Sequence, residues 1–249
     1  MNFKHSIALL LFLAISLVSF NACNKDDDDT VDVAEVEFHF DYLVNGQAYT
    51  PGQVYDINGT NVSFENVNFY IGDMAFARTS GNQTTFSGDH LLITPDAGAQ
   101  AVGEVAPGSF NQLSFFVGVA EDANNQTEED FTNRKDPDPL AEQTPSMHWS
   151  WNSGYKFIRI DGSVDTDGDG TPETGMQFHL GNNDRRATLQ FQGAYDLATG
   201  KNIMNFEFDI AKLFANIDLS TNYSFHTTPT ETATADTFVA NLANALSLK

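Results

Sequence analysis

The feature that most constrains the fold is a series of short segments in which apolar and polar residues alternate. Residues 31–44, VDVAEVEFHFDYLV, keep this period of two almost throughout. Alternation puts successive side chains on opposite faces of an extended chain, so that one face can be buried while the other meets water. The sequence therefore predicts β-strands, each with one apolar face.

Further segments have the length and composition of strands, and clusters of Gly, Asn, Asp and Pro separate them. They are residues 61–77, 90–94, 112–119, 155–164, 175–180, 187–195 and 202–210. Only residues 211–215 and 236–248 have a helical pattern. Many short strands with few helices predict an all-β fold, namely an antiparallel β-sandwich in a single domain with one or two short helices.

The N-terminus has the pattern of a bacterial lipoprotein signal. Residues 7–20 form an apolar run after Lys4, and Ala22 directly precedes Cys23, the single cysteine of the chain. The run is too short for a comfortable membrane span, but it has the length found in signal peptides. We therefore expect a signal peptide at residues 1–22, lipidation of Cys23 and attachment to the outer membrane.

An acidic stretch, NKDDDD at residues 24–29, follows the cysteine. Such a charge run is typical of a solvated tether, and it resembles the surface-export signal of some lipoproteins. We therefore expect a flexible tether at residues 23–34, a folded domain at residues 35–249, and exposure at the cell surface. The alternative is an ordinary secretory signal in which Cys23 carries no lipid.

The formal charge of −22, from 34 acidic and 12 basic residues, narrows the classes of partner. Nucleic-acid backbones bind basic surfaces, so this composition argues against a nucleic-acid partner. The same charge attracts cations. The sequence contains no nucleophile elbow, zincin motif or phosphate-binding loop, and we therefore expect a protein that is not an enzyme.

The segment DTDGDGTPE, residues 165–173, has the composition of a loop that binds a hard cation. Carboxylates at alternate positions can converge on one ion because the glycines let the backbone curl, and such a flexible oxygen site favours Ca²⁺. The expected ligands are Asp165, Asp167, Asp169 and Glu173. The loop is not an EF-hand, because its twelfth position is Met176. The alternative is a solvated turn without a metal.

Residues 147–157, MHWSWNSGYKF, contain both tryptophans of the chain beside a histidine and a methionine. They follow residues 120–146, a polar segment that is unusually long for a loop of a compact domain. In a strand, the methionine and both tryptophans would share one face, whereas His148 would lie on the other. Aromatic residues with this period are typical of a core strand, but imidazole and thioether groups are also copper ligands.

Five sequence motifs and their order along the chain indicate a relationship to a known family. They are VNFYIGDMAF (67–76), LSFFVGV (113–119), NRKDPDPL (133–140), SMHWSWNSGYKFIRIDG (146–162) and FHLG (178–181). Together they resemble the MbnP-like family, the copper-binding proteins associated with methanobactin and their lipoprotein relatives. The resemblance covers residues 35–249 and implies a secreted β-sandwich that binds copper through histidines.

The resemblance also implies roles for individual residues. His179 matches the histidine of the family's FHxG motif, and a histidine in the first strand, here His39, is typical of the family. Trp149 and Trp151 match the paired tryptophans of the MxWxWxxGYxF motif. In some members one tryptophan is oxidised to kynurenine by a partner dihaem peroxidase and then contributes to the copper site.

We therefore expect a copper site built mainly on His39 and His179, beside the tryptophan pair. Met147 could add a soft thioether ligand for Cu(I). His148 would contribute only if its strand is twisted or bulged. The remaining histidines of the mature chain, His90 and His226, are given no role.

The function expected from these features is that of a surface or periplasmic lipoprotein that acquires or buffers copper. The alternative is an adhesin or glycan-binding module with a structural Ca²⁺, in which tryptophan and tyrosine rings stack on sugars. A copper site requires histidines within a few ångströms of one another. A glycan site requires indoles exposed on one flat face.

Overall fold

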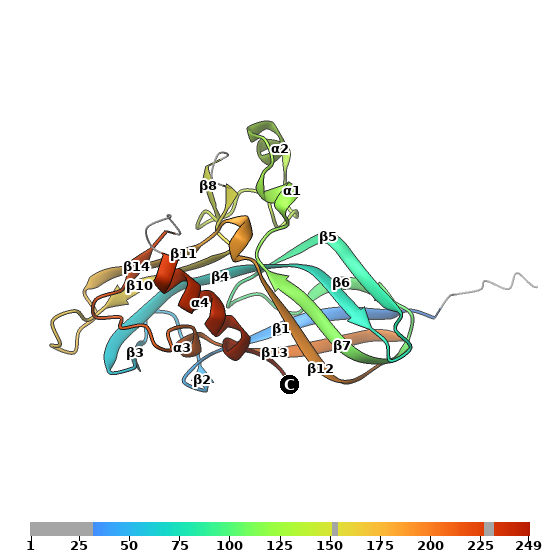
Figure 1. Ribbon diagram of the computed structural model, residues 1–249, viewed down its shortest axis with the longest axis horizontal. Helices are drawn as coiled ribbons and strands as arrows, with labels where there is room; N and C mark the ends of the chain where they lie inside the picture. Colours follow the sequence, from blue (N-terminus) through green and yellow to red (C-terminus); the bar gives the residue numbers. More distant parts are fainter. Residues whose placement is uncertain (1–31, 151–153, 227–231) are drawn as a thin grey trace, which may run out of the picture. The chain divides into compact units, whose positions relative to one another are not determined.

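The computed structural model describes residues 32–150, 154–226 and 232–249 (Figure 1). The residues from Asp32 to Lys249 form one compact unit. The predicted signal peptide, Cys23 and most of the tether lie outside the described residues, as does Trp151. None of the described helices is long and apolar enough to cross a membrane.

Two β-sheets contain all but two of the described strands. The first contains β1 (Ala34–Val44), β2 (Gln47–Ala48), β6 (Gln100–Val105), β13 (Gly200–Asp209) and β15 (Leu246–Leu248). The second contains β3 (Val54–Ile57), β4 (Thr60–Ala77), β5 (Gln83–Ile93), β7 (Gly108–Val117), β10 (Ile158–Val164), β11 (Thr174–Leu180), β12 (Ala187–Leu197) and β14 (Ser224–Phe225). A separate hairpin joins β8 (His148–Ser150) to β9 (Gly154–Tyr155).

The helices are few and mostly short. They are α1 (Glu121–Asn124), α2 (Glu128–Asn133), the 3₁₀ turn η1 (Asn183–Arg185), α3 (Ile210–Leu213) and α4 (Thr232–Ala245). This architecture confirms the expected all-β sandwich with few helices. The predicted C-terminal helix extended too far, because residues 246–248 leave it and pair with β13 as strand β15.

The expectation of purely antiparallel sheets needs correction, because both sheets are mixed. β1 runs parallel to β13, and β11 runs parallel to β14. The alternation of apolar residues shows which face of a strand is buried but says nothing of the direction of its neighbour. The direction follows from how the long connections run, which only the folded chain reveals.

The core between the two sheets consists largely of phenylalanine rings. The ring of Phe40 in β1 lies 5.6 Å from that of Phe69 in β4 and 4.7 Å from that of Phe206 in β13, centre to centre. Phe38 and Phe40 are buried, whereas the side chain of His39 between them is 35% exposed. The predicted alternation therefore holds in β1, and His39 lies on the outer face of the first sheet.

β4 organises the second sheet, because its 18 residues pair with four other strands. Its first half pairs with β3 and β10, and its second half pairs with β5 and β7. The register breaks between Gly72 and Met74, where Asp73 has a φ of 49°. β4 pairs with β5 and β7 on both sides of this break, whereas its pairing with β10 already ends at Phe69.

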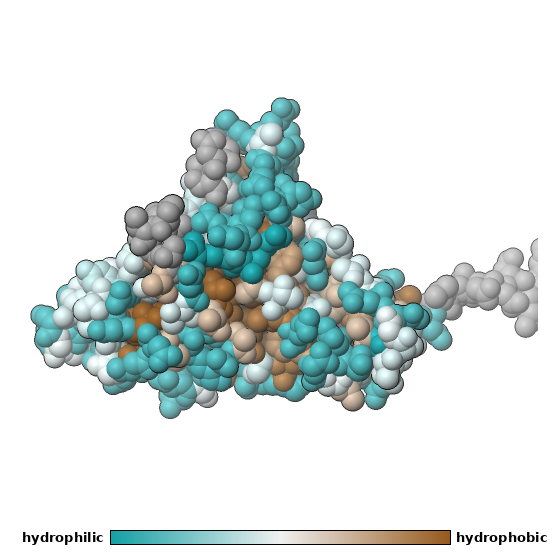
Figure 2. Space-filling model, viewed as in Figure 1, coloured by the Kyte–Doolittle hydropathy of each residue, from teal (hydrophilic) through white to brown (hydrophobic). Residues whose placement is uncertain are grey.

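A second, smaller apolar cluster lies on the outer face of the second sheet. Its members are Tyr70, Val119, Phe131, Leu140, Met147, Tyr155 and Phe157. Tyr70 alternates along β4 with Phe69 and Ile71, which belong to the main core. The segment 120–146, expected to be a loop, thus carries α1 and α2 and packs on this face, together with β8 (Figure 1). Its outer surface is mostly hydrophilic (Figure 2).

Helices α3 and α4 cover the end of the sandwich at which β11 and β14 lie. Phe238 of α4 stacks 5.8 Å from Phe178 of β11 and lies 5.4 Å from Phe225 of β14. Asn241 of α4 donates hydrogen bonds to the carbonyl oxygens of Leu213 and Ala215. These contacts hold the short strand β14 against β11, which matters for the site described below.

The bulge between Asp161 and Gly162 in β10 leads to a testable requirement for glycine. A Cβ atom at Gly162 would lie 2.0 Å from the carbonyl oxygen of Ser63 in β4, so one strand would have to move. We predict that Gly162→Ala lowers the free energy of unfolding by about 3 kcal/mol in denaturant titrations.

Gly175 of β11 is the matched control for this prediction, because it pairs with Ser163 in the neighbouring position. Apart from its own residue and its two chain neighbours, no described residue has an atom within 4 Å of the place where its Cβ would be. Gly175→Ala should therefore change the free energy of unfolding by less than about 0.5 kcal/mol. Similar losses in the two variants would contradict the argument.

Candidate functional site

His179 lies on the outer face of the second sheet. In β11, its neighbours Phe178 and Leu180 point into the main core, and alternation turns His179 the other way. Its side chain is nevertheless only 6% exposed, because the β8–β9 hairpin and neighbouring residues cover it. The Nε2 atom of His179 lies 2.7 Å from Oδ1 of Asp161 in β10.

The short strand β14 brings a second histidine to the same place. β14 runs parallel to β11, and Phe178 pairs with Phe225. Both of these rings enter the core and lie 5.0 Å apart, centre to centre. The residues that follow, His179 and His226, face the other side together, with ring centres also 5.0 Å apart and ring planes at 89°.

Trp149 reaches the two histidines because β8 is bulged. His148 pairs with Tyr155 and Ser150 pairs with Gly154, so Trp149 is the extra residue of the bulge. The Trp149 ring is centred 6.1 Å from the ring of His179 and 6.0 Å from that of His226. We call these three residues the Trp149–His179–His226 cluster.

Two basic residues complete the surroundings of the cluster. The Lys156 ammonium lies 5.4 Å from the centre of the Trp149 ring and donates hydrogen bonds to the carbonyl oxygens of Ser146 and His148. Desolvation, assisted by repulsion from Arg159, lowers the pKa of Lys156 to about 8. Arg159 itself donates from Nε to the second oxygen of Asp161 at 2.5 Å.

The histidine and its carboxylate partner have complementary charge states. Burial lowers the pKa of His179 and outweighs the hydrogen bond to Asp161, which raises that pKa. Burial raises the pKa of Asp161, but the hydrogen bonds from His179 and Arg159 outweigh it and lower that pKa. At neutral pH the imidazole is therefore uncharged, which is the form that binds metals, beside an ionised carboxylate.

The structure places His148 and Met147 away from the cluster. The His148 ring stacks 4.0 Å from Phe131 and meets the edge of Tyr155 at 4.7 Å. Desolvation, with a smaller contribution from Lys156, lowers the pKa of His148 to about 4. Met147 is 1% exposed within the second apolar cluster. The bulge does exist, but it turns Trp149 rather than His148 toward His179.

His39 is also not brought to His179. It lies on the outer face of the first sheet, with Nε2 3.2 Å from Oδ1 of Asp41. His179 lies on the outer face of the second sheet, and the main core separates these two faces. The expected pairing of His39 with His179 therefore needs correction, because each points outward from its own sheet.

His226 is the residue that sequence reasoning missed. β14 is only two residues long, too short for alternation to mark it as a strand. The available signal was the repetition of a Phe-His pair, QFH at residues 177–179 and SFH at residues 224–226. In adjacent parallel strands this repeat places two rings in the core and two imidazoles outside it.

The acidic loop between β10 and β11 brings together all four of its expected ligands. One carboxylate oxygen from each of Asp165, Asp167, Asp169 and Glu173 lies within 4.8 Å of the others. Asp165 also accepts hydrogen bonds from the backbone N–H groups of Gly168 and Gly170, at 2.7 and 2.8 Å. Desolvation raises the pKa of Asp165, but these N–H groups outweigh it and lower that pKa below its ordinary value.

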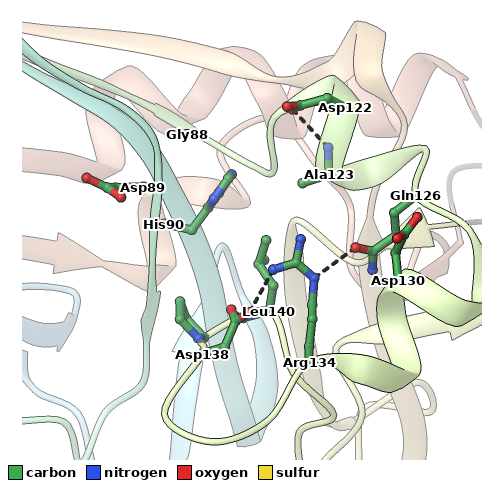
Figure 3. Close-up of a pocket in the computed structure, with 11 residues that line it drawn as sticks. Gly88, Asp89, His90, Asp122, Ala123, Gln126, Asp130, Arg134, Asp138 and Leu140 are labelled. Carbon is green, nitrogen blue, oxygen red and sulfur yellow. Dashed lines mark hydrogen bonds and ion pairs between the residues drawn. The ribbon is translucent and has the colours of Figure 1, made fainter.

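A cavity of about 610 Å³ lies beside α1 and α2, and no member of the Trp149–His179–His226 cluster lines it (Figure 3). Arg134 donates hydrogen bonds to Gln126 at 2.8 Å and to Asp138 at 2.7 Å. His90 accepts a hydrogen bond from the backbone N–H of Ala120 at 2.9 Å. These polar groups hold the α1–α2 segment on the sheet.

Comparison with known proteins agrees with this fold. The sequence model of the MbnP family matches residues 33–231, which is more than half of the chain. The solved structure of MbnP from Methylosinus trichosporium is similar, with a TM-score of 0.53 and 16% identity over 82% of this chain and 88% of that one. At this identity the structural likeness shows the fold alone, and no curated protein matches the chain. The family match shows that the chain belongs to the MbnP family.

Proposed function

We propose that this protein binds copper at the Trp149–His179–His226 cluster and serves in copper acquisition or buffering outside the cell. Membership of the MbnP family suggests a methanobactin-associated role and points to a non-catalytic accessory protein. The main support for the proposal is that the rings of His179 and His226 lie 5.0 Å apart, centre to centre, on the covered face of the second sheet.

The chemistry of the cluster favours copper over hard cations. The two histidines supply nitrogen donors, whereas hard cations such as Ca²⁺ and Mg²⁺ require several oxygen ligands. The nearest carboxylate, Asp161, already bonds to His179 and Arg159. A ligand set of neutral imidazoles therefore suits copper, and it replaces the His39–His179 pair expected from the sequence.

The proposal includes Trp149 as an oxidisable neighbour of the metal. The indole lies about equally far from both histidine rings, at 6.1 and 6.0 Å. Oxidation of Trp149 or Trp151 to kynurenine by a partner dihaem peroxidase is the modification that the family resemblance implies. Of the two indoles, Trp149 is the one that the described residues bring beside the histidines.

A glycan-binding module is less well supported. Sugar recognition by stacking needs an indole face open to solvent. Trp149 is only partly exposed, and His179, His226 and the Lys156 ammonium pack around it. This packing favours a role for the indole inside a site.

Copper titration tests the proposed ligands. We predict that His179→Ala and His226→Ala each weaken copper binding by at least about tenfold, which corresponds to ~1.4 kcal/mol, because each removes a nitrogen donor. His39→Ala is the matched control and should bind copper like the wild type. If His39→Ala alone weakens binding, or if none of the three does, the proposed site is wrong.

Lipid anchoring at Cys23 is the second part of the proposal, and it is supported by the sequence of residues 1–29. Because two or more acyl chains anchor a protein stably, Cys23→Ala should move the protein from the detergent phase to the aqueous phase on phase separation. Native protein that partitions in the same way as the variant would rule out the anchor and the outer-membrane location that depends on it.

We also propose that the loop at residues 165–173 binds Ca²⁺ and stiffens the β10–β11 connection. The support is the convergence of four carboxylates, which repel one another unless a cation lies among them. The flexible, glycine-containing loop fits Ca²⁺ better than Mg²⁺, which demands close octahedral geometry.

Thermal unfolding with and without metal tests the calcium site. Millimolar Ca²⁺ should raise the melting temperature of the wild-type protein, and Mg²⁺ should raise it less. Asp167→Asn keeps a side-chain acceptor for the backbone N–H of Asp169 but removes a charge, so it should reduce the Ca²⁺ effect. Asp184→Asn, outside the loop, should retain it. An unchanged wild-type melting temperature would exclude the site.

A further inference from the structure

We infer that Asp161 is the positioning residue of the copper site: it fixes the tautomer of His179 so that Nδ1 is the atom offered to the metal. The part of this inference that concerns metal rests on the proposed function, whereas the tautomer is a property of the protein alone.

The hydrogen bond between the two side chains determines which nitrogen carries the proton. Nε2 of His179 lies 2.7 Å from Oδ1 of Asp161, and the two side chains are 6% and 10% exposed. An ionised carboxylate can only accept hydrogen bonds, so Nε2 must be the donor. A neutral imidazole has one N–H, and the lone pair is then on Nδ1.

Asp161 is itself held in one orientation. Its Oδ2 atom accepts from Nε of Arg159 at 2.5 Å and from the amide of Asn66 at 3.3 Å. Arg159 in turn donates from Nη1 to the carbonyl oxygen of Ser146 at 2.7 Å, which connects it to the segment before β8. Because both partners of Oδ2 are donors, Oδ1 remains for His179 and the carboxylate has little freedom to rotate.

The backbone adds a further constraint on Asp161. Asp161 pairs with Gln177 across β10 and β11, so it is a diagonal neighbour of His179 on the same face. The register with β4 shifts between Asp161 and Gly162. The Asp161 carboxylate therefore reaches the His179 ring from the neighbouring strand of the same sheet. Trp149 and His226 contact that ring with their own aromatic rings. A carboxylate behind a metal-binding histidine orients the ring and makes it more basic.

His39 and Asp41 form a second His–Asp pair that lacks these constraints. Nε2 of His39 lies 3.2 Å from Oδ1 of Asp41, and the two side chains are 35% and 43% exposed. Asp41 also forms an ion pair with Lys249, whose Nζ lies 2.8 Å from Oδ2 of Asp41. Water can compete for both side chains, so this pair should not hold one tautomer. It provides a matched control within the same molecule.

The decisive variant is Asp161→Asn. Arg159 still requires an acceptor, so the amide oxygen should turn to Arg159 and the amide NH₂ to His179. Nε2 must then accept a hydrogen bond, and the proton moves to Nδ1, which removes the lone pair that the metal would use. We expect ¹⁵N NMR of the metal-free protein to show Nε2–H in the wild type and Nδ1–H in Asp161→Asn.

Copper affinity is measured on the same proteins and should fall at least tenfold in Asp161→Asn, while Asp41→Asn should change neither the His179 tautomer nor the affinity. A wild-type His179 in the Nδ1–H form overturns the inference, and this spectrum needs no folded variant. An unchanged tautomer in Asp161→Asn also overturns it, as does a changed tautomer with unchanged affinity. A wild type that binds no copper but shows Nε2–H would refute the proposed function and leave the tautomer assignment intact.

Discussion

The packing of phenylalanine rings between the two sheets is the interaction on which the rest of the structure depends. Each strand that contributes a ring to this core turns its next residue outward, because side chains alternate along a strand. Phe178 and Phe225 lie 5.0 Å apart in the core, and the outward residues that follow them are His179 and His226. The candidate copper site is thus a direct geometric consequence of how two core residues pack.

The outer face of the second sheet is unusual in being covered. The segment with α1 and α2 and the β8–β9 hairpin bury a second set of apolar residues there, including Tyr155 and Phe157. This cover holds Trp149 over the histidines and limits access of water to His179. Within the described part of the chain, no such segment covers His39 on the first sheet, which explains why one His–Asp pair is buried and the other exposed.

The electrostatics of the site differ from those of the whole chain. The chain carries a formal charge of −22, but beside the cluster Asp161 pairs with Arg159, and Lys156 adds a positive charge near Trp149. The acidic loop at residues 165–173 has the opposite character, with four carboxylates converging. The two candidate metal sites therefore differ in donor atoms and charge, and each suits a different class of ion.

The sequence by itself determined which faces of the long strands are buried, the all-β class, the acidic loop and the family resemblance. These features are local patterns, such as the alternation in residues 34–44 or the spacing of Asp165, Asp167 and Asp169. Only the tertiary structure decided that His226, rather than His39, accompanies His179. That choice depends on the parallel pairing of β14 with β11 and on a bulge at Trp149. The first is a contact between segments far apart in the sequence, and the second is a register shift within a hairpin. Alternation carries no information on which strands become neighbours or on where their register shifts.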